Sequence, residues 1–367
     1  MKELALAFLK LGFTAFGGPA AHIAMMEDEF VRRRAWLDRA QFLDLVGAAG
    51  LIPGPSSTEV ALYVGYRRAG WRGLWIAGAC FILPAAGMVT LFAWAYVRFG
   101  RLPTAGYVLY GIKAVVIAIV GQAVIAFART AVRSRWLLAL AVAAAGASAA
   151  GAPPALVLVA AGCVGAARRA WRRSPSQAAF LIGSGWGFSS ASAGSLGKLF
   201  LVFLKVGALV FGSGYVLLAF LRADLVEHAH WITEPQLIDA VAVGQFTPGP
   251  VFTTATFIGF VVAGLPGALV ATIGIFLPSF ALVVASGPLL PRLRRSELAG
   301  MFLDGVNVAS LALMAVVGVR LARAAIVDVP TACLAVASAV ALLRWRINSA
   351  WLVLGGGIVG AVVQWLR

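Results

Sequence analysis

Charged residues are scarce in this sequence. Only 12% of its 367 residues are charged, whereas 61% are hydrophobic, and soluble domains have about 25% charged residues. Apolar stretches long enough to cross a bilayer recur along the chain, at 74–97, 107–128, 267–290 and 298–319 among others. A soluble protein and a protein with a single membrane anchor are both excluded, and we expect an all-α polytopic membrane protein.

Cysteine and histidine are also rare, with three of each. Cys80, Cys163 and Cys333 lie far apart inside apolar stretches, and the histidines form no zinc-binding pattern. The sequence contains neither a nucleophile elbow nor a phosphate-binding loop, and its titratable residues are scattered. We therefore expect no metal, no cofactor and no enzymatic activity, with a membrane-embedded enzyme as the weakest alternative.

Acidic residues are outnumbered by basic ones, 14 to 30, which gives a formal charge of +16. In a soluble protein this excess would suggest nucleic-acid binding. Here the arginines lie in short loops between apolar segments, where basic residues mark the cytoplasmic face of a membrane. We expect the lipid bilayer as surroundings and no nucleic-acid partner. The first apolar segment begins near Leu4 without a separate cleavage site, so we expect it to be retained.

An internal repeat organises the chain. Residues 8–55 align with 203–250 at a constant offset of 195, and fifteen of the 48 aligned pairs are identical. The identities include a lysine, a tryptophan, an aspartate and a whole Pro-Gly-Pro triplet, which apolar drift would not produce. After one deletion the alignment continues at an offset of 194 through further Gly and Pro pairs. We expect a first repeat at 1–167, a polar linker at 168–196 and a second repeat at 197–367.

Equivalent loops of the two repeats differ in charge. The loop after the first segment has four arginines, at positions 32, 33, 34 and 39, whereas the aligned loop 222–234 has three acidic residues, two histidines and one arginine. By the positive-inside rule the repeats then have inverted topology. Inversion requires each Pro-Gly-Pro segment to be a re-entrant hairpin, with half-helices expected at 41–52 and 55–66 in the first repeat. We expect about 10 spans plus 2 hairpins; the alternative is about 12 spans.

Each repeat breaks its helices at two places, which is typical of a substrate site near the membrane midplane. A helix N-terminus presents unpaired N–H groups and partial positive charge, and a neighbouring glycine lets an oxyanion approach the backbone. The alternative is that the Gly and Pro residues only permit kinks and close packing. The residues expected to bind an anion at these breaks are Gly17, Gly18, Pro19, Pro53, Gly54, Pro55, Ser56, Ser57, Gly212, Ser213, Gly214, Pro248, Gly249, Pro250 and Thr253.

Two lysines occupy equivalent positions on otherwise apolar segments. Lys10 and Lys205 lie about two turns before the first break of their repeats. A lysine at membrane depth is a functional candidate, so we expect both to supply a positive charge that attracts the anion. The alternative is that their side chains reach the membrane surface.

Four other ionisable residues are candidates for coupling anion movement to a second ion: Asp44, Asp239, Glu59 and His22. The two aspartates are equivalent in the repeats, and local pairing is the slightly preferred interpretation for them. Glu59 has no acidic equivalent in the second repeat, which makes it a candidate for coupling; its alternative role is an ion pair with a nearby arginine. For His22, without an equivalent histidine, we prefer packing.

Four stretches, FLKLGFTAFGGPAAHI, PGPSS, FLKVGALVFGSG and QFTPGP, resemble the chromate ion transporter family in its long form with two fused homologous domains. The resemblance covers both repeats. It implies a multi-pass protein of the bacterial inner membrane that exports chromate from the cytoplasm, with sulfate as structural analogue and competitor. The second repeat lacks a proline at the position of Pro19, so two equal anion sites are not expected.

From the inverted repeats we expect transport by alternating access, with the anion bound at half-helix N-termini near the midplane. Transport of sulfate or another oxyanion is the main alternative, because these anions share geometry and charge. An anion channel is a second alternative. A homodimer is compatible with the sequence.

Overall fold

The computed structural model of the chain describes residues 1–100, 102–173, 196–211, 214–345 and 347–366. Throughout these ranges the regular structure is helical, with no strands. The helices of the first repeat are α1 (Lys2–Thr14), α2 (Gly18–Glu27), α3 (Arg39–Ala49), α4 (Ser56–Phe99), α5 (Pro103–Ala131), α6 (Arg135–Ala149) and α7 (Pro154–Arg173).

The second repeat has the same order of helices. They are α8 (Leu196–Leu209), α9 (Leu217–Leu221), α10 (Glu234–Phe246), α11 (Thr254–Arg295), α12 (Glu297–Ala325), α13 (Val329–Trp345) and α14 (Ser349–Trp365). Short π-helical turns, η1 (Asp28–Arg33) and η3 (Arg222–His228), follow α2 and α9, and short 3-10 turns, η2 (Gly214–Val216) and η4 (Val251–Thr253), precede α9 and α11. The repeat in the sequence is therefore a repeat of the fold.

Four helices of the described chain are long and apolar enough to cross a membrane. They are Ser56–Phe99, Ala105–Ala131, Val251–Ser286 and Glu297–Ala325. Four shorter apolar helices, Arg135–Ala149, Pro154–Arg168, Val329–Trp345 and Ser349–Trp365, and the two broken helices α1–α2 and α8–α9 add six candidate crossings. The all-α polytopic architecture predicted from the sequence is confirmed.

The first Pro-Gly-Pro segment is the tip of a hairpin. α3, of 11 residues, leads into it and covers about 17 Å. α4 begins directly after it, but the backbone leaves helical conformation at Ala69 and Gly70, where Gly70 has φ 57° and ψ −143°. Across this turn the backbones of Gly65 and Gly73 touch so closely that a Cβ on either would overlap the other's carbonyl. A straight helix would separate them by about 12 Å, so the chain turns back here.

The second repeat has an equivalent hairpin. Its backbone leaves helical conformation at Ala263 and Gly264, and Gly259 touches Gly267 across the turn. Each hairpin arm is thus shorter than the roughly 30 Å hydrocarbon layer. The predicted hairpins of two half-helices are confirmed, and the fully spanning alternative does not fit these short arms.

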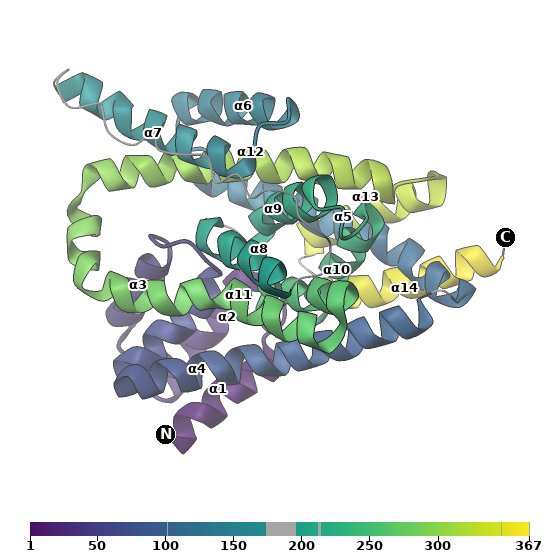
Figure 1. The fold of residues 1–367 in the computed structure, drawn as a ribbon, viewed down its shortest axis with the longest axis horizontal. Coiled ribbons are helices and arrows are strands. Elements are labelled where there is room, and N and C mark those ends of the chain that lie inside the picture. The colour runs from purple at the N-terminus through teal and green to yellow at the C-terminus, as the bar shows by residue number, and fades with distance from the viewer. Residues whose placement is uncertain (101, 174–195, 212–213, 346, 367) are drawn as a thin grey trace.

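The repeats are interlocked through their later helices. α5 packs along α13 and α14, and α12 packs along α6 and α7 (Figure 1). A Cβ on Gly111 of α5 would lie 2.8 Å from Cα of Gly360 in α14, and one on Gly305 of α12 would lie 3.1 Å from Cα of Gly162 in α7. Small residues permit such close approach between membrane helices. We call α5–α7 and α12–α14 together the frame.

The remaining helices form a second group, the hairpin bundle, which consists of α1–α4 and α8–α11. Within it α1 packs on α4, α8 packs on α11, and α4 packs against α11 from the other repeat. A charge-reversed ion pair marks equivalent places in the two halves. Arg39 Nε lies 3.4 Å from Glu27 Oε1, and at the equivalent positions Arg222 Nε donates to Glu234 Oε1 at 2.8 Å. The repeats keep their geometry although these charges are exchanged.

Candidate functional site

The helix breaks of the two repeats meet through reciprocal backbone hydrogen bonds. Gly54 N–H, at the tip of the first hairpin, donates to the carbonyl of Val210 at 2.8 Å. Gly249 N–H, at the tip of the second hairpin, donates to the carbonyl of Ala15 at 2.8 Å. Ala15 and Val210 are equivalent residues that end the first helix of their repeats. Each hairpin tip is therefore bonded to the broken helix of the opposite repeat, and we call this region the helix-break site.

The N-terminal ends of three helical elements also approach one another there. A Cβ on Gly214, the first residue of η2, would lie 4.0 Å from Cγ of Pro19 and 3.9 Å from Cβ of Val251. Pro19 is in the first turn of α2, and Val251 begins η4. His22 Nδ1 lies 3.3 Å from Ser57 Oγ, which joins α2 to the start of α4. Gly212 and Ser213, two predicted anion-binding residues, lie outside the described residues.

Glycine is required at several of these positions by the backbone. Gly17, Gly18, Gly54 and Gly249 have φ of 100°, 80°, 138° and 94°. These positive values strain any residue with a Cβ. The predicted kink-forming role of these glycines and their predicted closeness to an anion are compatible, because glycine both permits this backbone conformation and lets a ligand approach the backbone closely.

The two repeats differ in how accessible their breaks are. Pro53 and Ser56 are half-buried, whereas their equivalents Pro248 and Val251 are buried; Gly17 of the first repeat is exposed. In the second repeat the hydroxyls of Thr253 and Thr254 donate to carbonyls of their own turn, those of Pro250 and Val251, at 2.8 Å each. These hydroxyls are occupied by local bonds.

The N-terminus of α4 is a partly accessible helix start of this group. N–H groups in the first turn of a helix have no carbonyl four residues earlier in the helix to pair with. Ser56 and Ser57 are in that turn, directly after Pro55. The positive end of the α4 helix dipole also lies here. Ser56 is half-buried and Ser57 is buried, and this arrangement of amide donors at a positive helix end suits a small oxyanion.

The two predicted lysines form equivalent ion pairs. Lys10 Nζ lies 3.1 Å from Glu29 Oε2, and Lys205 Nζ lies 2.6 Å from Asp224 Oδ1. Glu29 and Asp224 are themselves equivalent residues. The Lys10 side chain is 52% exposed. Each lysine is therefore bound to a carboxylate of its own repeat, and a role in attracting the anion stays a prediction.

The equivalent aspartates have different environments. Asp239 of α10 is buried; its Oδ2 accepts a hydrogen bond from Tyr96 Oη at 3.0 Å, and its Oδ1 lies 3.3 Å from Lys113 Nζ. Asp44 of α3 is exposed. Tyr96 and Lys113 were not among the predicted site residues. The sequence signal for Lys113 was a charge inside the apolar helix α5, at a position where the aligned residue of the second repeat is Asn307.

Glu59 is the most isolated carboxylate of the described chain. It lies in the first turn of α4, is fully buried, and neither of its carboxylate oxygens has a hydrogen-bond partner. Its carboxylate contacts the place where a Cβ of Gly54 would be, and Ser279 Oγ from α11 lies 2.6 Å from the same place. Sequence reasoning did not select Ser279, because one serine in a long apolar helix carries no signal by itself.

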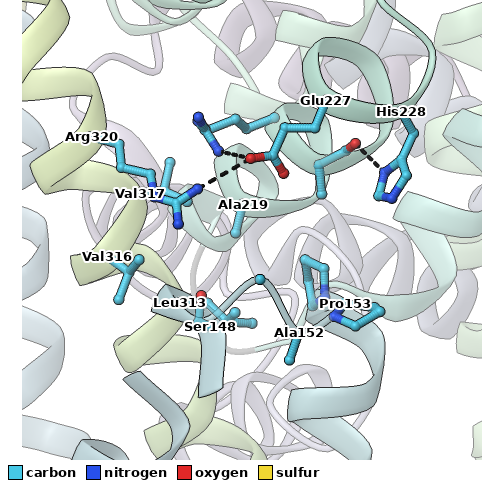
Figure 2. A pocket seen from close by; sticks show the side chains of 14 residues that line it. Ser148, Ala152, Pro153, Ala219, Glu227, His228, Leu313, Val316, Val317 and Arg320 are labelled. Atoms are coloured by element: carbon cyan, nitrogen blue, oxygen red, sulfur yellow. Dashed lines mark hydrogen bonds and ion pairs between the residues drawn. The ribbon is translucent and has the colours of Figure 1, made fainter. Parts of the chain in front are cut away.

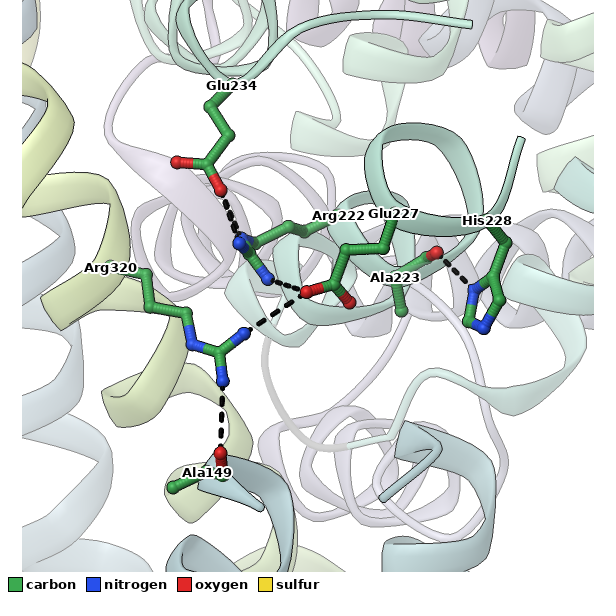
Figure 3. A network of polar contacts seen from close by, with 7 residues as sticks. All are labelled: Ala149, Arg222, Ala223, Glu227, His228, Glu234 and Arg320. Carbon is green, nitrogen blue, oxygen red and sulfur yellow. Dashed lines mark hydrogen bonds and ion pairs between the residues drawn. The ribbon is translucent and has the colours of Figure 1, made fainter. Parts of the chain in front are cut away.

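A small pocket lies away from the helix-break site, between α12, the α6–α7 connection and the segment α9–η3 (Figure 2). Arg222 and Arg320 both line it, but both are paired with Glu227, and Arg320 also donates to the carbonyl of Ala149 at 3.3 Å (Figure 3). Because each guanidinium already has a carboxylate partner, this network joins the hairpin bundle to the frame. It offers a small anion no unneutralised charge.

These features define a class of protein. Interlocked repeats, crossing helices and a central site made of helix breaks are the architecture of multi-pass secondary transporters with internal repeats. Comparison with known families is more specific. The family model described as chromate transporter matches residues 2–166 and 197–361, so the chain belongs to the chromate transporter family.

Named relatives agree with this membership. The chain is 34% identical to a protein of Cupriavidus metallidurans named "Chromate transport protein", over 99% of this chain and 93% of the relative. It is 35% identical to a "Probable chromate transport protein" of Synechococcus elongatus, over 77% of this chain and 75% of the relative. A "Chromate transport protein" of Pseudomonas aeruginosa is 32% identical over 76% of this chain and 71% of the relative. No solved structure matches the chain.

Proposed function

We propose that this protein transports chromate across the bacterial inner membrane and exports it from the cytoplasm by alternating access. The names of its relatives support the substrate. The observation that carries the mechanism is the reciprocal pair of hydrogen bonds from Gly54 to Val210 and from Gly249 to Ala15. These bonds hold four helix breaks together between the repeats, where transporters of this architecture bind their substrate.

The anion is held at the N-terminus of α4. Chromate is a tetrahedral dianion, and the amides of Ser56 and Ser57 with the helix dipole provide the donors and the positive potential that such an anion needs. Sulfate has the same shape and charge, so it competes for the same donors. The second repeat contributes buried backbone and holds the tip of the first hairpin in place.

The moving bodies are the hairpin bundle and the frame. Because α5 and α12 pack on the last helices of the opposite repeat, the two repeats do not separate as units. Movement of the hairpin bundle against the frame opens the helix-break site to one side and then to the other. In a cell that is negative inside, export of a dianion is favoured by about 2.3 kcal/mol per charge for each 100 mV.

Anion flux in proteoliposomes tests the proposal. Labelled chromate flux would be measured at a fixed membrane potential for the wild type and for Lys10→Ala and Lys205→Ala, with sulfate as competitor. We expect saturable chromate flux that sulfate inhibits. Ohmic conductance without saturation would point to a channel, and absence of chromate flux in correctly inserted protein would refute the chromate assignment.

A further inference from the structure

Glu59 is a carboxylic acid buried in the interior of the protein. Its side chain is fully buried in the first turn of α4, and both carboxylate oxygens lack hydrogen-bond partners. Burial of an ionised carboxylate without partners is far more costly than burial of the neutral acid. The predicted alternative, an ion pair with an arginine, does not occur among the described residues. The conformation described here therefore fits a neutral Glu59.

A hydroxyl group of the opposite repeat lies beside this carboxyl group, and a second belongs to the preceding residue. Thr58 Oγ1 and Ser279 Oγ are also buried without hydrogen-bond partners. Ser279 comes from α11 of the second repeat, and both it and Glu59 contact the space beside Gly54. Three buried polar groups without partners thus gather at the hairpin tip, where the two repeats meet. Buried polar groups in native proteins nearly always have hydrogen-bond partners, so unpartnered groups at one place point to a functional role.

Other ionisable groups near Glu59 are few. α2 contributes His22, which is buried and lies 3.3 Å from Ser57 Oγ. α11 contains no ionisable side chain between Thr254 and Ser286. The charged residues on α1, α2, α3 and α10, which also pack against α4, are Lys2, Glu3, Lys10, Glu27, Arg39, Asp44, Glu234 and Asp239.

Within the described part of the chain, none of these charged side chains forms a hydrogen bond with the Glu59 carboxylate, and several are bound elsewhere. Lys10 pairs with Glu29, Arg39 with Glu27, and Asp239 with Lys113. His22, which contacts Ser57 at the start of α4, is therefore an alternative pH-sensitive group. The test must separate the two.

We propose that Glu59 binds a proton together with the oxyanion, so that each transport cycle carries one proton in the same direction as one dianion. The inference rests on the proposed function. Glu59 and the amides of Ser56 and Ser57 belong to the same first turn of α4, so an ionised Glu59 would repel the anion there. The neutral acid removes this repulsion, and anion binding in turn favours the protonated form.

A proton fits this place better than a metal ion does. Ca²⁺ takes about six to eight oxygen ligands, whereas the buried side-chain groups without partners here are one carboxyl and two hydroxyls. A proton needs only transient contact of Glu59 with water, which is available when the hydrogen bond from Gly54 to Val210 opens and the hairpin tip moves.

The consequence is a change in charge balance. A dianion carried with one proton moves one net negative charge across the membrane instead of two. The membrane potential therefore acts on one charge in each cycle, and a pH gradient that is acid on one side drives the anion away from that side. At zero potential one pH unit balances a tenfold anion gradient, since tenfold corresponds to about 1.4 kcal/mol.

The experiment measures equilibrium anion accumulation in proteoliposomes. Labelled chromate is used under alkaline conditions, where it is a dianion on both sides, with the potential held at zero and a pH gradient imposed. For the wild type, the chromate concentration on the more alkaline side is expected to be about tenfold that on the other side for each pH unit. Glu59→Gln, which mimics the neutral acid, is expected to show no accumulation from the pH gradient. The equilibrium accumulation ratio does not depend on turnover rate, so a variant with slow transport can still be tested.

Two control variants separate Glu59 from other ionisable side chains. Glu297→Gln changes an exposed first-turn glutamate of another long helix and should keep the response of the wild type. A His22→Asn variant should also keep it. Loss of the response in His22→Asn but not in Glu59→Gln, or accumulation driven by a sodium gradient instead of a pH gradient, would overturn the proposal.

The wild type alone gives a test that needs no variant. Potential-driven chromate flux without any response to a pH gradient would refute the proton site and leave the proposed function standing. Absence of chromate flux under every gradient would refute the proposed function, and this inference with it.

Discussion

Replacement of Ser56 tests whether backbone amides at the start of α4 hold the anion. Ser56→Pro removes both the amide hydrogen and the hydroxyl, whereas Ser56→Ala removes the hydroxyl alone. Proline is favoured in the first turn of a helix. The preceding Pro55, at φ −76° and ψ 96°, already has the extended conformation that a following proline requires. The exchange should therefore leave the helix intact.

The expected losses follow from the hydrogen bonds removed. A hydrogen bond to a charged acceptor contributes about 1.5–3 kcal/mol, so Ser56→Pro should raise the Kd for chromate about 10- to 150-fold. The Ser56 side chain is half-buried, and water can replace its hydroxyl. Ser56→Ala should therefore cost about 0.5–1.5 kcal/mol, or roughly two- to twelvefold.

Equilibrium binding of labelled chromate to purified protein in lipid nanodiscs measures both effects. Val251→Pro is the matched variant, because Val251 is equivalent to Ser56 and also follows a Pro-Gly-Pro triplet. Equal affinities for Ser56→Pro and the wild type would refute an anion site at this amide. A loss in Val251→Pro as large as that in Ser56→Pro would refute the asymmetry between the repeats.

Three further predictions concern stability, each measured by unfolding of the purified protein in detergent. Lys113→Met leaves buried Asp239 without its cation and should cost about 3–5 kcal/mol, while the double variant with Asp239→Asn should recover most of the loss; no recovery would show that the pair does not act as a unit. Lys10→Ala should cost only about 0.2–1 kcal/mol, because Lys10 is half exposed and buried Glu29 keeps its ion pair with Arg34, and a larger loss would contradict this. Gly264→Ala, at φ 62° with open space around it, should cost about 1–2 kcal/mol, whereas Gly267→Ala overlaps the returning backbone and should cost more; the reverse order would refute the tight turn.

Much of the fold could be predicted because Gly and Pro are positioned by backbone geometry. The Pro-Gly-Pro triplets recur at the same place in both repeats, and each proves to be a hairpin tip. The turns at Gly70 and Gly264 fall on aligned glycines for the same reason. Which helices pack across the repeats could not be predicted, because those contacts use small residues that are abundant throughout the chain.

The partners of the site residues were harder to predict. The hydrogen bonds to Ala15 and Val210 use carbonyl groups, so side-chain identity carries no signal for them. The aligned aspartates have different environments because Lys113 has no equivalent lysine, which matters only once α5 is known to lie beside α10. In contrast, the acidic partners of the two lysines occur 19 residues later in both repeats, and this regularity was available in the sequence.

Inversion of the repeats does not depend on whether the short helices cross the membrane. α6, of 15 residues, covers about 22 Å, less than the hydrocarbon layer. If α6 and α7 turn back as a pair, the number of crossings in the repeat falls by two and stays odd, as inversion requires. The frame then keeps its glycine contacts in either case. The polar contacts between frame and hairpin bundle, Lys113 with Asp239 and Arg320 with Glu227, can exchange partners where close-packed backbones cannot. Movement is therefore expected to break these ion pairs first.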